Sequence, residues 1–143
     1  MSEDDQLERF VSAQDRSYLA VLEELKRGRK KNCWMWFIFP QMRGLGSSRN
    51  SRFYGIDSME EARRFLRHPV LGQRLRECTE VVNLTRGLSA EQIFGPDEGK
   101  LKSSATLFLL AGGGPQFEQC LNTYFNGEKD FRTVELLQIG GAE

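Results

Sequence analysis

The fold is decided by the stretch Leu101-Lys102-Ser103-Ser104-Ala105-Thr106-Leu107-Phe108-Leu109-Leu110-Ala111. We predict a helix here, and its second half is apolar nearly all the way round the helix axis. A helix that lacks a polar face must be covered by other elements on every side. Residues 101–111 are therefore expected to form the central helix of the molecule, with the rest of the chain packed around it.

Helical periodicity continues on both sides of this stretch. Apolar side chains recur at i, i+3, i+4 and i+7 spacing over residues 6–27, with a break near Asp15 where a second helix begins. The run Asp57-Ser58-Met59-Glu60-Glu61 predicts a helix start, with Asp57 or Ser58 as the cap and Glu60 or Glu61 as its reciprocal partner. Further helices are predicted over residues 69–86, 89–94, 117–125 and 133–137, the last capped by Thr133.

These patterns predict a mainly α fold with little or no β structure, in one compact bundle of about six to eight helices. A length of 143 residues suits one domain, spanning residues 1–143 with an ordered core over about 5–137. The 20 basic and 20 acidic residues cancel, so no overall field steers the protein toward nucleic acid.

Composition also bounds the location and the chemistry of the protein. Cys33, Cys78 and Cys120 are far apart and odd in number, which argues against a disulfide framework and a zinc site. We predict no metal and no cofactor. The acidic start of the chain is unlike a secretory signal, and no apolar run approaches the roughly 18–20 residues that cross a bilayer. The expected location is the cytoplasm.

An aromatic segment, Lys30-Lys31-Asn32-Cys33-Trp34-Met35-Trp36-Phe37-Ile38-Phe39-Pro40-Gln41, stands out from this background. It has no clear period, so a short strand, a buried extended segment and a helix turn all remain open. Trp34 and Trp36 share one face if the segment is extended. They can then stack a base, at about 1–3 kcal/mol each, or simply fill the core.

Two polar groups of residues are candidates for anion binding. The loop over 43–52 offers Gly44 and Gly46, with Ser48, Arg49 and Arg52 as donors, but it lacks the Walker A and Rossmann patterns. A solvated flexible loop is the alternative.

The second group contains Asp97, Lys100, Lys102, Ser103 and Ser104, with both serines at a predicted helix N-terminus. Simple helix capping is the alternative for this group.

The remaining titratable residues carry weaker patterns. His68 precedes Pro69 at a helix junction, where a capping role is expected rather than catalysis. The pairs Glu23-Glu24 and Glu60-Glu61 have the pattern of solvated helix faces.

Three runs of the chain resemble the signature of the DUF1810 family of uncharacterised domains. They are GRKKNCWMWFIFPQMRGLGSS at residues 28–48, EARRFLRHPVLGQRLREC at 61–78, and IFGPDEGKLKSSATLF at 93–108. The family is placed in the YbiA-like superfamily beside the NADAR domains. Those relatives are mainly α-helical and act on N-glycosidic bonds, in riboflavin-pathway intermediates or in ADP-ribosylated guanine.

The resemblance implies a nucleotide-like or ADP-ribose-like ligand and, for an enzyme, N-glycosidase chemistry. Its oxocarbenium-like transition state needs a carboxylate near the sugar and cations on the phosphate. Glu61 or Asp97 is the predicted carboxylate. The predicted ligand-binding residues are Lys30, Lys31, Trp34, Trp36, Gln41, Ser48, Arg49, Lys100, Ser103 and Ser104. The alternative is a non-catalytic module that binds nucleic acid or a protein partner.

Overall fold

The computed structural model of the protein describes residues 3–85 and 87–141. Its elements are α1 (Glu3–Asp15), α2 (Tyr18–Lys26), α3 (Met35–Ile38), α4 (Arg49–Phe53), α5 (Met59–Arg67), α6 (Leu71–Leu84), α7 (Ala90–Phe94), the 3-10 helix η1 (Gly95–Asp97), α8 (Glu98–Leu110), α9 (Pro115–Phe125) and α10 (Phe131–Gly141). In the described residues the β pairing is limited to an isolated bridge between Met42 and Ile56. The prediction of a mainly α single domain is confirmed.

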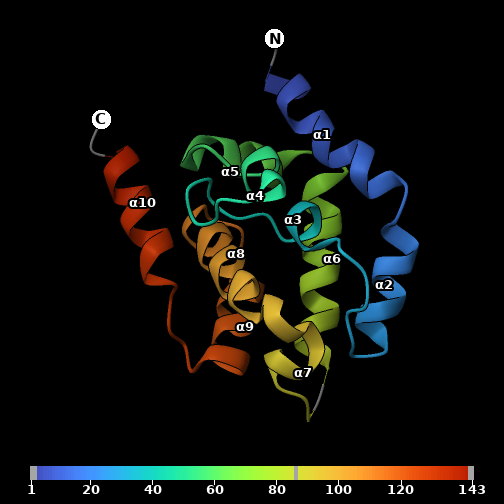
Figure 1. Cartoon of the computed structure of the whole chain (residues 1–143). Coiled ribbons are helices and arrows are strands. Elements are labelled where there is room, and N and C mark those ends of the chain that lie inside the picture. The colour runs from blue at the N-terminus through green and yellow to red at the C-terminus, as the bar shows by residue number, and fades with distance from the viewer. Residues whose placement is uncertain (1–2, 86, 142–143) are drawn as a thin grey trace.

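Helix α8 is the centre of the molecule, as its sequence predicts. Every residue from Ser103 to Phe108 is buried, and α5, α7, α9 and α10 all pack against the helix. The ring of Phe108 lies 5.3 Å from that of Phe65 in α5 and 5.9 Å from that of Phe117 in α9, measured between centroids. Figure 1 shows α8 between α10 on one side and α6 on the other, with α2 beyond α6.

The start of α8 corrects one prediction. The helix begins at Glu98, not at Leu101, because η1 runs directly into it. Ser103 and Ser104 therefore lie in the second turn of the helix and not at its N-terminus. The backbone amides there take part in the helix ladder and are not free to bind an anion.

The aromatic segment is a helix turn, the last of the alternatives open from the sequence. Trp34 is the N-cap of α3, and Met35 to Ile38 form its one turn. Residues two apart on a helix point about 200° apart, so Trp34 and Trp36 do not share a face. Trp34 is buried in the core, whereas Trp36 is half-buried.

Capping decides where the other helices begin. Ser58 Oγ accepts a hydrogen bond from the Glu61 amide at 3.1 Å, so the predicted start of α5 is confirmed. His68 Nδ1 accepts from the amides of Val70 at 3.1 Å and Leu71 at 3.2 Å, which is the expected capping role. The predicted cap Thr133 is wrong, since α10 begins two residues earlier and the Asp130 carboxylate accepts from the Thr133 amide at 3.0 Å.

The structure has more helices than predicted because α3 and α4, which contain only 4 and 5 residues, were not among the expected helices, whereas the short helix predicted at residues 89–94 is present as α7. Such short helices are too brief to show a period in the sequence. No helix of the described residues has both the length and the apolar character required to cross a membrane.

Candidate functional site

One carboxylate and two lysines from separate segments meet at the N-terminal end of α8. Asp97 Oδ2 lies 2.9 Å from Lys30 Nζ, and Asp97 Oδ1 lies 2.6 Å from Lys100 Nζ. The side chains of Lys30, Asp97 and Lys100 are 9%, 16% and 32% exposed, respectively. We call these three residues the lysine–aspartate cluster. It carries a net charge of one positive unit, which suits an anionic ligand.

The local backbone explains why these residues meet. The Lys30 amide donates a hydrogen bond to the Ile93 carbonyl at 2.7 Å, which fixes the segment after α2 against α7. Asp97 ends η1, and Lys100 follows one turn later in α8. The two partners of Lys30 are thus held by one continuous helical run, and the cluster is positioned by helices rather than by a loose loop.

Both tryptophans border the cluster, each beside one lysine. Lys100 Nζ lies 4.6 Å from the centroid of the Trp36 ring, and Lys30 Nζ lies 5.2 Å from that of Trp34. An ammonium over an indole face is stabilised by the ring quadrupole. The structure therefore brings together Lys30, Trp34, Trp36, Asp97 and Lys100 from the residues predicted in the sequence.

The environment of Asp97 decides its charge. Burial raises the pKa of its carboxyl, but the hydrogen bonds and positive charges of Lys100 and Lys30 outweigh burial, so the pKa is lowered. Asp97 is therefore a carboxylate at neutral pH. It can stabilise a nearby positive charge, but it cannot donate a proton there.

Two buried donors near the cluster have no hydrogen-bond partner among the residues that the structure describes. They are Trp36 Nε1 and Ser104 Oγ, the latter one helical turn beyond Lys100. Leaving a buried polar group unpaired costs about 1–3 kcal/mol. Trp36 also lines a cavity of about 10 Å³ with Gln41, Ser51 and Tyr54, which has room for about one water molecule.

Glu24 holds the first part of the aromatic segment in place through four hydrogen bonds. Its carboxylate accepts from the amides of Lys31 at 2.6 Å and Asn32 at 3.1 Å, from Asn32 Nδ2 at 2.7 Å, and from Trp34 Nε1 at 2.9 Å. Burial raises the pKa of this carboxyl, but these hydrogen bonds outweigh it and lower the pKa to about 2. The prediction of a solvated face at Glu23-Glu24 is wrong for Glu24, which is buried.

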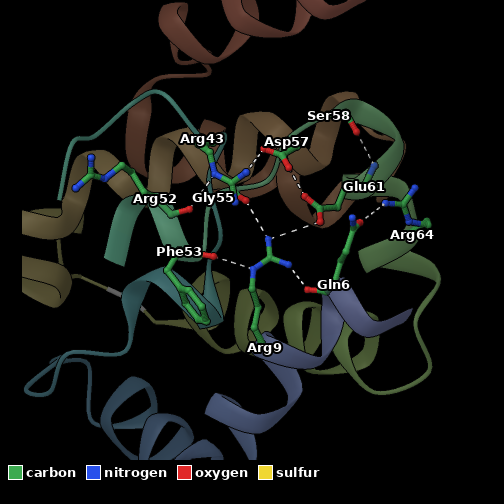
Figure 2. A network of polar contacts seen from close by, with 10 residues as sticks. All are labelled: Gln6, Arg9, Arg43, Arg52, Phe53, Gly55, Asp57, Ser58, Glu61 and Arg64. Carbon is green, nitrogen blue, oxygen red and sulfur yellow. Dashed lines mark hydrogen bonds and ion pairs between the residues drawn. The ribbon is translucent and has the colours of Figure 1, made fainter. Parts of the chain in front are cut away.

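Glu61, the other predicted carboxylate, lies in a separate network (Figure 2). Its side chain is 3% exposed and lies 3.6 Å from Arg9 Nη2, while its second oxygen accepts from the Asp57 amide at 2.8 Å. Arg9 also donates to the carbonyls of Phe53 at 2.8 Å and Gly55 at 3.0 Å. The prediction of a solvated face is wrong for Glu61 too. Within the described residues, neither Arg9 nor Glu61 forms an ion pair with a member of the lysine–aspartate cluster.

The other predicted ligand-binding residues lie outside the cluster. Lys31, Ser48 and Arg49 are exposed. Ser48 Oγ caps α4 by accepting from the Ser51 amide at 3.1 Å, and Ser103 Oγ donates to the Gly99 carbonyl at 3.1 Å. The described part of the chain has no group of three or more His, Cys, Asp or Glu side chains placed to hold a metal ion.

Sequence reasoning missed Arg9, Glu24, Ser51 and Tyr54. The burial of Glu24 could have been predicted, because it lies three residues after the buried Val21 on the apolar side of α2. Ser51 and Tyr54 had none, since they face Trp36 only through the path of the loop before α4.

Comparison with known proteins identifies the family of this chain, but the matching descriptions state no activity. A family model described as "Protein of unknown function (DUF1810)" matches residues 4–137. A solved structure described as the conserved hypothetical protein Rv1873 from Mycobacterium tuberculosis is 53% identical, with a TM-score of 0.91. The match covers 92% of this chain and 96% of that one. No curated protein matches the chain.

Proposed function

Since the chain belongs to the DUF1810 family, whose description states no activity, we propose a function from its site: binding of a nucleotide-like or ADP-ribose-like ligand at the lysine–aspartate cluster and Trp36. The observation that carries the proposal is the position of two unpartnered buried donors, Trp36 Nε1 and Ser104 Oγ, beside a cluster with net positive charge. A ligand with acceptor atoms and a phosphate satisfies both features.

The roles follow from exposure and pairing. Lys100 is the most exposed member of the cluster, so its ammonium can turn from Asp97 to a phosphate. Lys30 is nearly buried and keeps Asp97 ionised. Trp36 contributes its ring and its free N–H, whereas Trp34 is held in the core by Glu24.

The chemistry that fits this arrangement is cleavage of an N-glycosidic bond. The bond between the sugar C1 and the base nitrogen breaks, and its electron pair leaves with the base. The ionised Asp97 stabilises the positive charge that develops on the sugar. A water molecule then adds its hydroxyl group to C1, and its proton goes to the leaving base. The resemblance of the chain to YbiA-like and NADAR domains supports this reaction class.

The first experiment is thermal unfolding against ADP-ribose, NAD, ribose 5-phosphate and GMP. A ligand at about a hundred times its dissociation constant stabilises by about 2.7 kcal/mol, a shift of several degrees. Release of free base from the matching N-glycoside is then followed by chromatography, in the wild type and in Asp97→Asn. Loss of release in Asp97→Asn with binding retained supports the enzyme. The absence of any shift with the four ligands contradicts the proposal.

A non-catalytic binding module is the second candidate function, and one observation favours it. Both oxygens of Asp97 are already paired with lysines, so the carboxylate is not free to approach a sugar until Lys100 moves. Ligand binding without base release by the wild type selects this candidate over the enzyme.

A further inference from the structure

Helix α4 presents two different faces to its surroundings. Successive helical residues turn by about 100°, so Arg49, Arg52 and Phe53 lie within one third of the helix circumference. Ser51 lies on the opposite side and lines the cavity beside Trp36. The outward side therefore carries two guanidinium groups and a phenyl ring that is 55% exposed. Figure 2 shows the Arg52 side chain directed away from the network of Arg9 and Glu61.

A second segment adds cations and an aromatic ring to the same surface. Arg132 Nη2 donates to the Gly44 carbonyl at 3.4 Å, which joins the start of α10 to the loop before α4. The preceding residue, Phe131, is 75% exposed. Arg43 extends the surface on the other side, because its Nε donates to the Arg52 carbonyl at 2.8 Å. We call the set the arginine face: Arg43, Arg49, Arg52, Phe53, Phe131 and Arg132.

This face is unbalanced in charge, although the chain as a whole is neutral. Arg43 is ion-paired with Asp57. Arg49, Arg52 and Arg132 have no ion pair within the described part of the chain. Two further acids lie beside Arg132. Glu135, one turn later in α10, is exposed and forms no ion pair in the described residues, and Asp130 accepts hydrogen bonds from Thr133. The three arginines without an ion pair outnumber these two carboxylates. The arginine face is therefore cationic, and it fits a polyanion.

We propose that the arginine face binds single-stranded nucleic acid. Guanidinium groups pair with phosphates in two parallel hydrogen bonds, and exposed aromatic rings stack unpaired bases. The bases of a duplex are already stacked on one another and are therefore not available to stack on the phenyl rings.

A membrane surface fits less well. Binding there needs a continuous apolar helix face, whereas the apolar residues Leu136 and Leu137 of α10 pack against the core.

The test is fluorescence anisotropy of a labelled polythymidine strand with the full-length protein at several salt concentrations. Phosphate contacts from the three arginines without an ion pair give a slope of log affinity against log salt of about −2. The double variant Arg49→Gln/Arg52→Gln should reduce the slope by about 1.4. Phe131→Ala should weaken binding about tenfold or more while leaving the slope unchanged, because stacking releases no counterions.

The matched control is Arg16→Gln/Arg27→Gln, which removes the same charge from exposed positions at the two ends of α2. It should leave both the affinity and the slope unchanged. Equal losses in the two double variants would overturn the proposal, because the effect would then be one of net charge. Binding of a duplex as tightly as the single strand, of vesicles with anionic lipid in place of the strand, or of no polyanion at all would also overturn it.

Discussion

Two ion-paired carboxylates of this chain, Glu61 and Asp97, are surrounded in different ways. Glu61 is 3% exposed, and its oxygens are occupied by Arg9 and by a backbone amide. Asp97 is 16% exposed, its partner Lys100 is one third exposed, and unpartnered donors lie nearby. A satisfied, buried network stabilises the fold and leaves nothing for a ligand. An accessible ion pair beside unsatisfied donors is the arrangement expected of a binding site.

The substitution Glu61→Gln is the strongest test of whether the Glu61 network stabilises the fold. The neutral glutamine side chain removes the negative charge beside the Arg9 guanidinium, which is mostly buried. Breaking a buried ion pair costs about 3–5 kcal/mol, so the free energy of unfolding should fall by that amount in urea titrations. Glu60→Gln, which removes an exposed carboxylate 3.5 Å from Arg64, should cost less than about 1 kcal/mol. Equal losses would show that the Arg9 network is not structural.

Acid unfolding tests the third carboxylate, Glu24, as a structural group. Its pKa is near 4.5 when the chain is unfolded and about 2 in the fold. Between these values the unfolded state binds more protons, so stability falls as the pH falls. The contribution of Glu24 is complete above about pH 4.5, and about 3 kcal/mol is lost by about pH 2. In Glu24→Gln the unfolding free energy should fall less steeply over this window, and an unchanged pH dependence would contradict the assignment.

Replacing each tryptophan by phenylalanine tests which of the two stabilises the core and which belongs to the proposed site. Trp34→Phe removes a donor to a buried carboxylate, and the unfolding free energy should fall by about 1.5–3 kcal/mol. Trp36→Phe removes an N–H that has no partner, so the loss should stay below about 1 kcal/mol. Thermal or urea unfolding of the pair measures the difference. A larger loss in Trp36→Phe would place Trp36, not Trp34, among the structural residues.

Asp97→Asn should have a smaller effect on stability than Glu61→Gln or Glu24→Gln. Lys100 can be solvated when its carboxylate is lost, and Lys30 keeps the oxygen of the amide as an acceptor. Since Lys30 is nearly buried, the expected loss of unfolding free energy is about 1–2 kcal/mol, which is still below that of Glu61→Gln under the same conditions. A loss as large as that of Glu61→Gln would make Asp97 a structural carboxylate and remove the contrast on which the site rests.

Much of the fold follows from patterns that the sequence contains. The apolar stretch around Leu107 and Phe108 identified the central helix, and Ser58 and His68 cap helices as predicted. The short helices α3 and α4 were not predicted because a helix of one turn shows no period, whereas α7 was predicted from its capping residues. The site was predicted only in part. Asp97 and Lys100 are neighbours on one helical run, but their meeting with Lys30 depends on how α7 packs against the segment after α2.

The charge state and exposure of a carboxylate are also tertiary properties. Glu24 and Glu61 each stand in a pair of acidic residues, and the pattern of such a pair suggests a solvated surface. In the structure one member of each pair is buried, because Trp34 and Arg9 bring donors to it from segments outside the pair. The sequence around each pair does not show which distant residues supply these donors.

The central claim is that the lysine–aspartate cluster binds an anionic ligand, and two lysines of α8 test it most directly. Lys100 and Lys102 are partly exposed and each forms one ion pair with a carboxylate, but only Lys100 belongs to the cluster. The measurement is the shift in melting temperature caused by ADP-ribose in the wild type, Lys100→Met and Lys102→Met. We predict a rise of several degrees in the wild type and in Lys102→Met, and none in Lys100→Met. Equal shifts in all three proteins, or no shift in any of them, would contradict the account.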